Sequence, residues 1–226
     1  INAPSVPTAA ADISAVVESL TAGYDIVVAN NTLYAAWSAS ATTVRVVYMS
    51  TAFILSTPRT ITGYKSDLMS VVADITASTS VIWVTFWQGA TGEIHSTAYS
   101  QTLQPIKAPT QVPSEPTVAA LTSVAANGVL TVIYYTLNVY SFGTNERTDF
   151  LSAATVPQVG SVTGPTVILR SAGLASKAFY DVSNGNNYVL AAYGEINQPT
   201  YFLIDLEGNI YARLAYANGG GYVTSQ

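Results

Sequence analysis

The single histidine, His95, is the first residue to consider as a catalyst, because an imidazole can act as a base near neutral pH. In a serine hydrolase, folding would bring it beside a serine and a carboxylate from distant parts of the chain. No Gly-x-Ser-x-Gly segment, which would present such a serine, occurs in the sequence. We therefore expect His95 to lie on a hairpin and to face solvent or a partner.

The acidic residues could serve glycoside hydrolysis, which needs two carboxyl groups about 5–10 Å apart. Asp74 and Asp181 each follow the first apolar strand of a repeated unit, which favours a turn-forming role, since aspartate accepts hydrogen bonds from nearby backbone N–H groups. The stretches 181–186 and 205–209 are rich in oxygen ligands but lack the spacing of a calcium loop. With no cysteine either, the sequence indicates no catalytic site, no metal and no cofactor, and it favours a protein that is not an enzyme. The acidic residues considered are Asp25, Asp67, Asp74, Glu115, Asp149, Asp181 and Glu195.

A charged loop beside aromatic residues is the best candidate for a contact surface. It spans Gly143–Asp149, the most charged stretch of the chain, and tyrosine is common at interfaces. The alternative is a solvated loop above core tyrosines. Asn30, in the only Asn-x-Ser/Thr sequon, is a candidate glycosylation site on a turn. The candidate contact residues are Tyr135, Tyr140, Phe142, Asn145, Glu146, Arg147 and Asp149.

The composition excludes several classes of protein. Charged residues make up 9% of the chain, against about 25% in ordinary soluble domains, so Ser and Thr carry most of the polarity. The net charge of −5 lacks the basic footprint of a nucleic-acid binder, and 49% hydrophobic residues exclude a disordered chain. No apolar run reaches about 18 residues, so we expect no membrane insertion.

These residues must be positioned by strands, because four segments repeat one pattern. An apolar strand, a short polar turn and a second strand ending in an aromatic residue follow one another. Asn30-Asn31 and Asn127-Gly128 are turn sequences that two-residue hairpins favour. The closing aromatics and a set of prolines both recur about every 50 residues. The aromatics are Trp37, Phe86, Tyr134 and Tyr193, and the prolines are Pro58, Pro109 and Pro165.

Each unit has room for four antiparallel strands, which is the size of a β-propeller blade. The sequence therefore predicts an all-β, propeller-like fold of four repeats. In the first repeat we expect the third and fourth strands at 44–48 and 53–55. The segment 1–23 is either a helix or the strand that closes the last blade. The expected units are 1–23, the repeats 24–62, 63–112, 113–168 and 169–216, and a Gly-rich tail at 217–226.

Two of these units resemble blades of the sialidase-like, Asp-box-related propellers, from Pro109 to Tyr134 and from Pro165 to Tyr193. The resemblance extends over residues 24–216 and implies the propeller topology. The Asp-box itself, Ser-x-Asp-x-Gly-x-Thr-Trp, is absent from all four units, so no catalytic residue is carried over from that family. The alternative architecture is two tandem β-sandwich domains, joined by the proline-rich stretch 105–116.

Together these features favour a non-catalytic module on a cell or virion surface. Low charge reduces repulsion between copies, so we expect the protein to pack into an assembly or to adhere to a surface glycan or protein. The expected partners are copies of itself or other subunits, and no nucleic acid. One alternative is a glycan-active hydrolase, with two carboxylates and an arginine or aromatic residue in a central pocket. Another is an extracellular filament subunit that donates its N-terminal strand to a neighbour.

Overall fold

A computed structural model shows that the described part of the chain folds into β-strands and turns. No helix in that part could span a membrane. The described residues are 23–52, 54–64, 66–77, 79–88, 90–114, 117–141, 146–170, 175–193, 200–217 and 220–225.

The strands form four antiparallel sheets, called sheets I to IV here, and within each sheet they follow one another in sequence order. Sheet I contains β1 (Tyr24–Ala29), β2 (Thr32–Ser40), β3 (Thr43–Met49) and β4 (Arg59–Thr62). Sheet II contains β5 (Leu68–Asp74), β6 (Val81–Gln88), β7 (Glu93–Ser100) and β8 (Pro105–Val112). Sheet III contains β9 (Val118–Ala126), β10 (Val129–Ser141), β11 (Glu146–Pro157) and β12 (Thr163–Arg170). Sheet IV contains β13 (Ala175–Asp181), β14 (Asn186–Tyr193), β15 (Thr200–Asp205), β16 (Ile210–Ala217) and β17 (Gly220–Ser225).

The first hairpins of sheets I and III turn as the sequence predicts. Asn30 and Asn31 have φ angles of 49° and 59°, and Asn127 and Gly128 have φ angles of 54° and 79°. Two successive positive φ angles match the right-handed twist of the flanking strands, which is why these dipeptides favour two-residue turns. This prediction is confirmed.

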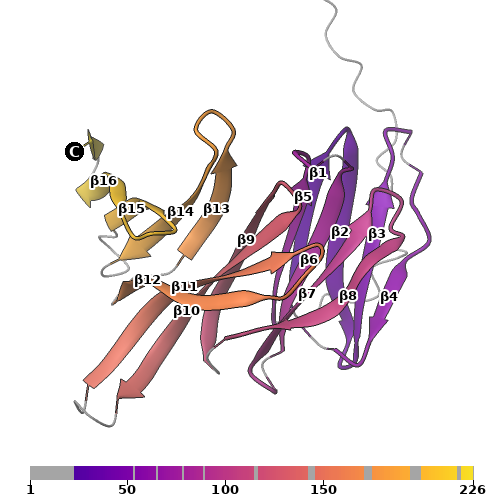
Figure 1. The fold of residues 1–226 in the computed structure, drawn as a ribbon, viewed down its shortest axis with the longest axis horizontal. Coiled ribbons are helices and arrows are strands. Elements are labelled where there is room, and N and C mark those ends of the chain that lie inside the picture. Colours follow the sequence, from indigo (N-terminus) through magenta and orange to yellow (C-terminus); the bar gives the residue numbers. More distant parts are fainter. Residues whose placement is uncertain are drawn as a thin grey trace, which may run out of the picture.

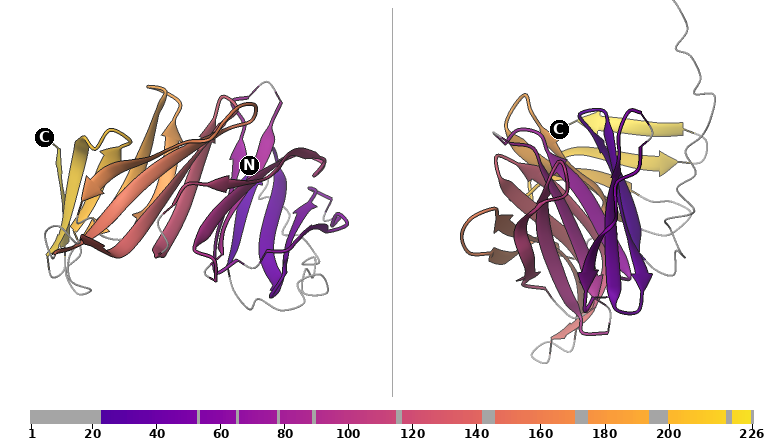
Figure 2. Two further views of the ribbon diagram at one scale, coloured as in Figure 1. Left: turned by 60° about the horizontal axis from the view of Figure 1, so that its bottom comes forward. Right: turned by 90° about the vertical axis from the view of Figure 1, so that its right-hand side faces the viewer.

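The sheets stand side by side in sequence order, from sheet I at one end to sheet IV at the other (Figures 1 and 2). Their first strands, β1, β5, β9 and β13, lie next to one another and form the inner edge of the arrangement. The prediction of an all-β, propeller-like fold is confirmed by this topology. The proline-rich stretch is not a linker between sandwiches, because 105–112 is β8, the outer strand of sheet II.

The recurring prolines mark the outer strand of a sheet. Pro109 lies in β8 and Pro165 in β12, and both fall where the pairing with the neighbouring strand shifts register. Proline has no N–H to donate, so an outer strand with an irregular ladder tolerates it and is also protected from further strand pairing. The period seen in the sequence therefore reflects the repeated outer edge of the sheets.

The core is divided among the interfaces between successive sheets. Residues of each first strand are numbered here backward from its last residue, so that Ala29, Asp74, Ala126 and Asp181 hold position 0. Positions −1 and −3 face the preceding sheet, and positions −2 and −4 face the following sheet, because side chains alternate along a strand. At position −2, Val27, Val72 and Val124 pack into the clusters between sheets I and II, II and III, and III and IV, respectively.

Two expected elements differ in the structure. The fourth strand of sheet I is β4 rather than 53–55, because Ile61 is buried toward sheet II while Ile54 is 67% exposed. The expected Gly-rich tail contains β17, which pairs with β16 through backbone groups that need no side chain. Asn218-Gly219, the dipeptide between these strands, is a turn sequence that the prediction overlooked. The segment 1–23, expected as a helix or as the closing strand, lies outside the described residues except for Gly23.

Candidate functional site

The main candidate site is a cavity of about 460 Å³ where the inner strands of all four sheets converge. The sequence places it there because each unit contributes its first strand to the same edge. Its lining is mixed, with apolar residues from β1, β5, β9 and β13 and several side chains that carry oxygen. The polar residues of the lining are Asp25, Ser70, Thr76, Thr122, Ser123 and Tyr180.

Polar contacts at this cavity repeat from one sheet to the next. Position −4 holds Asp25 in β1, Ser70 in β5 and Thr122 in β9, and each reaches position −3 of the following inner strand. Oδ2 of Asp25 accepts a hydrogen bond from the backbone N–H of Val71 at 2.7 Å. The hydroxyl oxygens of Ser70 and Ser123 lie 2.8 Å apart, and Oγ1 of Thr122 accepts a bond from the Ala178 N–H at 3.3 Å. The polar lining therefore also holds the sheets together.

Within the described lining, Asp25 is the only carboxylate, and no arginine is present. Its two oxygens accept backbone N–H bonds from Ile26 and Val71. A hydrolase of the usual kind needs a second carboxyl group to share acid and base roles. The described geometry suits hydrogen bonding to a neutral ligand better than proton transfer. Glu115 and Glu195, two of the expected acidic candidates, lie outside the described residues.

Asp74 and Asp181 occupy turns, as the repeat predicts. Oδ1 of Asp181 accepts bonds from the backbone N–H and hydroxyl of Ser183, and these bonds lower the pKa of Asp181. Oδ1 of Asp74 accepts the corresponding bonds from Thr76, and its Oδ2 accepts one from the Gly128 N–H of sheet III at 2.6 Å. Asp74 is fully buried, so it links two sheets and is not available for chemistry. The turn-forming role is confirmed by these bonds.

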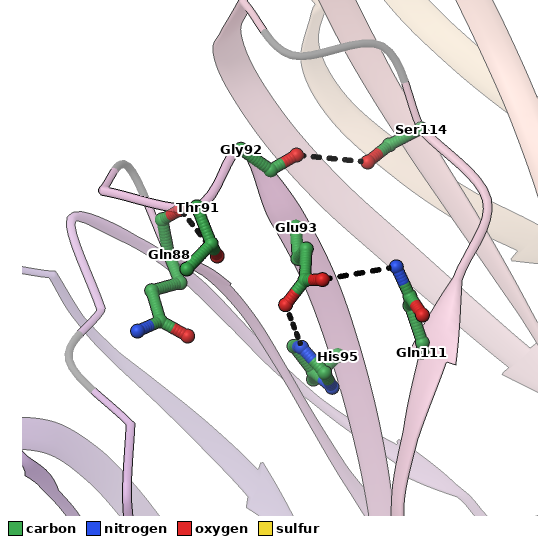
Figure 3. A network of polar contacts seen from close by, with 7 residues as sticks. All are labelled: Gln88, Thr91, Gly92, Glu93, His95, Gln111 and Ser114. Carbon is green, nitrogen blue, oxygen red and sulfur yellow. Dashed lines mark hydrogen bonds and ion pairs between the residues drawn. The ribbon is translucent and has the colours of Figure 1, made fainter.

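His95 is buried in an aromatic cluster. On β7 it lies opposite Phe86, and its ring centroid is 5.8 Å from that of Phe86 and 4.8 Å from that of Tyr64. Its Nε2 lies 3.1 Å from Oε2 of Glu93, whose Oε1 accepts a bond from Gln111, as Figure 3 shows. His95 lies on the β6–β7 hairpin as predicted, but the prediction that it faces solvent or a partner is wrong, because the ring of Tyr64, from the segment before β5, packs on it.

Tyr135, predicted as a contact residue, belongs to the core between sheets III and IV and is 5% exposed. Its hydroxyl donates a hydrogen bond to Oδ2 of Asp149 at 2.8 Å. Burial raises the pKa of Tyr135, and the bond to Asp149 raises it further. Tyr135 is therefore removed from the predicted contact surface.

The expected charged loop is largely a hairpin, since β11 begins at Glu146 and pairs with β10. This hairpin extends from the body of the molecule at the lower left of Figure 1. The extra length of the third repeat thus lengthens two strands. The contact surface stays a prediction, because apart from Asp149, which accepts the bond from Tyr135, the side chains of its other members lie outside the described part. These residues are Tyr140, Phe142, Asn145, Glu146 and Arg147.

The two oxygen-rich loops lie together around a second cavity of about 260 Å³ on sheet IV. The oxygens of Asp205 accept bonds from the backbone of Glu207 and from the backbone and side chain of Asn209. Burial acts to raise the pKa of Asp205, but these bonds outweigh it and hold the pKa below its ordinary value. Protein donors thus take up the carboxylate oxygens that a metal ion would need. Among the described residues no group of three acidic or histidine side chains could hold a metal.

Asn30 is exposed at the tip of the first hairpin, and its side-chain amide donates a hydrogen bond to Ser80 at 3.1 Å. Its glycosylation stays a prediction. The residues of the central cavity, above all Ser70, Ser123 and Tyr180, were missed by sequence reasoning. The available signal was that each lies within the last five residues of an inner strand, which becomes meaningful only once these strands are known to converge.

No protein-family model matches the sequence, and no curated protein shows significant similarity to it. The chain is similar in fold to a GH43 endo-arabinanase from Bacillus licheniformis, with 15% identity, 89% of this chain and 75% of that chain covered, and a TM-score of 0.45. It is also similar to a mutant α-L-arabinanase of Cellvibrio cellulosa, with 12% identity, 90% and 76% coverage, and a TM-score of 0.40. The propeller-like fold itself follows from the sheet topology described above.

Proposed function

We propose that the chain is a non-catalytic module that binds a neutral, hydroxyl-rich ligand, a glycan unit, in the central cavity. The observation that carries the proposal is the described lining of hydroxyl side chains with one carboxylate. Sugar hydroxyls both donate and accept hydrogen bonds, and Ser, Thr and Tyr hydroxyls do the same. The tyrosine ring of Tyr180 adds a flat surface for the apolar face of a sugar.

The size and charge of the cavity agree with this ligand. A volume of about 460 Å³ falls within the range of small-molecule sites, roughly 300–1,000 Å³. The described lining includes no cation that would select a phosphate or a carboxylate. The low overall charge supports a place on a cell or virion exterior, where many copies stand close together.

The test is titration of the full chain with a panel of neutral oligosaccharides, followed by calorimetry or ligand-observed NMR. Tyr180→Ala removes the ring from the cavity and is expected to weaken binding about tenfold or more. Tyr211→Ala is the matched control, because Tyr211 is exposed on sheet IV outside the central cavity. Binding that is absent across the panel at millimolar concentration, or equal in both variants, would contradict the proposal.

A glycan-active hydrolase would use the same cavity, with Asp25 as one of its two carboxylates. Release of reducing sugar from the same panel, abolished by Asp25→Asn, would replace the proposal with this alternative. A filament subunit with a donated N-terminal strand depends on residues 1–22, which lie outside the described residues, and stays a hypothesis. The resemblance of the units to sialidase-like, Asp-box-related repeats also stays a hypothesis, because the motif itself is absent from them.

A further inference from the structure

Within the part of the chain that the structure describes, two apolar surfaces are exposed at the two ends of the row of sheets. In sheet I, Tyr24, Ile26 and Val28 are 64%, 58% and 68% exposed on the face of β1 that points away from sheet II. In sheet IV, Phe179 and Tyr211 are 41% and 45% exposed on the face that points away from sheet III. Isolated exposed apolar residues are ordinary, but grouped ones indicate an interaction surface.

The repeated inner-strand positions show what each surface lacks. At position −3, Val71, Ser123 and Ala178 are buried against the preceding sheet, and Ile26 holds the same position with no preceding sheet among the described residues. Each of the three internal junctions joins a front half, positions −2 and −4 of one inner strand, to a rear half, positions −1 and −3 of the next inner strand. The end face of β1 corresponds to such a rear half.

The end face of sheet IV is the front half of the same kind of junction. Val27, Val72 and Val124 at position −2 are packed by the following sheet, whereas Phe179 at that position is exposed. The Phe179 ring lies 5.7 Å from the ring of Tyr188, which lies 5.3 Å from the ring of Tyr211. The outward face of sheet IV thus carries a continuous row of three aromatic rings.

We propose that these faces bind each other between copies of the chain, with sheet IV of one molecule packed on sheet I of the next. Each internal junction joins a front half to a rear half. Between two copies, sheet IV of one molecule supplies the front half and sheet I of the next molecule supplies the rear half. Pairing of two sheet I faces, or of two sheet IV faces, has no counterpart inside the molecule. This contact does not require a ligand in the central cavity, although Ile26 also lines that cavity.

The contact joins two different faces, so a copy that binds through its sheet I face still exposes its own sheet IV face to the next copy. Association of this kind continues into a filament or closes into a ring. Lys177 holds position −4 in β13, where the internal junctions have the acceptors Asp25, Ser70 and Thr122. A lysine side chain cannot accept a hydrogen bond, so the contact between copies lacks the polar bond that the internal junctions have at this position. We expect association that is reversible and that depends on concentration.

The experiment is light scattering or sedimentation of the full chain across a concentration series that reaches about 100 µM, a concentration that detects micromolar association. The wild type is expected to grow beyond a dimer. Ile26→Lys and Phe179→Lys each place a charge in one face and are expected to weaken association about a hundredfold. Val159→Lys is the matched control, because Val159 is 89% exposed and lies outside both faces.

Mixing the two interface variants gives the decisive readout. Ile26→Lys keeps an intact sheet IV face, and Phe179→Lys keeps an intact sheet I face. An equimolar mixture of these two variants, each monomeric alone, is therefore expected to form a 1:1 dimer and no larger species. A wild type that stays monomeric would overturn the proposal and indicate that another segment or partner covers the faces. Assembly of either variant alone, or a mixture that stays monomeric, would also overturn it.

Discussion

At the scale of single residues, aspartate serves this protein as an acceptor for backbone N–H groups. Asp74, Asp181 and Asp205 each cap the N–H groups of a turn, and Asp25 bonds an N–H of the next sheet. A buried carboxylate that accepts several bonds is costly to remove, because its donors lose both partner and water. These four aspartates thus fix turns and junctions between sheets.

Replacement of Asp74 by alanine tests this role. The substitution leaves the N–H groups of Thr76, Ala77 and Gly128 without their acceptor at a partly buried turn, and we expect a loss of about 2–3 kcal/mol in the free energy of unfolding. Urea denaturation measures it. Asp181→Ala is the control, since it removes an equivalent turn without the described bond to another sheet. Equal losses in the free energy of unfolding for both variants would show that the bond between Asp74 and sheet III contributes nothing to stability.

At the scale of elements, the sequence predicts the inner strands of each sheet better than the outer ones. Strands beside an Asn-Asn or Asn-Gly turn are specified by local chemistry, and β1, β2, β9 and β10 lie where the pattern indicates. The choice of 59–62 over 53–55 for β4 depends on whether Ile61 or Ile54 meets sheet II, which is a contact between distant segments. His95 and Tyr135 were misplaced for the same reason, since residues outside their own hairpins cover them.

Two glycines at turns allow the energetic cost of a positive φ angle to be measured separately from the cost of a steric contact between sheets. Gly63 and Gly208 both have φ of 90°, but a Cβ on Gly63 would meet nothing within 4 Å, whereas on Gly208 it would lie 2.7 Å from the carbonyl oxygen of Ile168 in β12. We expect Gly63→Ala to cost about 1–2 kcal/mol for the positive φ alone. Gly208→Ala should cost at least about 1 kcal/mol more, because the turn must move away from sheet III. Thermal or urea unfolding of the pair measures the difference, and equal costs would mean that the contact gives way freely.

At the scale of the whole molecule, each sheet packs mainly on its neighbours in the row, so stability accumulates junction by junction as in repeat proteins. The central cavity is a product of this scale, because its lining comes from four units about 50 residues apart. Sequence reasoning identified the units but could not bring Ser70 beside Ser123, since their contact depends on how sheets II and III pack. The cavity and the two end faces therefore become visible only in the assembled arrangement.

Hydrogen exchange of matched strands tests this organisation. β2, β6, β10 and β14 are the second strands of their sheets, and each is paired on both sides, so their backbone pairing is comparable. Among the described residues, sheets II and III are covered on both faces and sheets I and IV on one, and residues 81–86 of β6 are fully buried. We therefore expect amides of β6 and β10 to exchange about ten times more slowly than those of β2 and β14 in dilute protein. Mass spectrometry of the exchanging peptides gives the rates, and equal rates in all four strands would show that the molecule opens only as a whole.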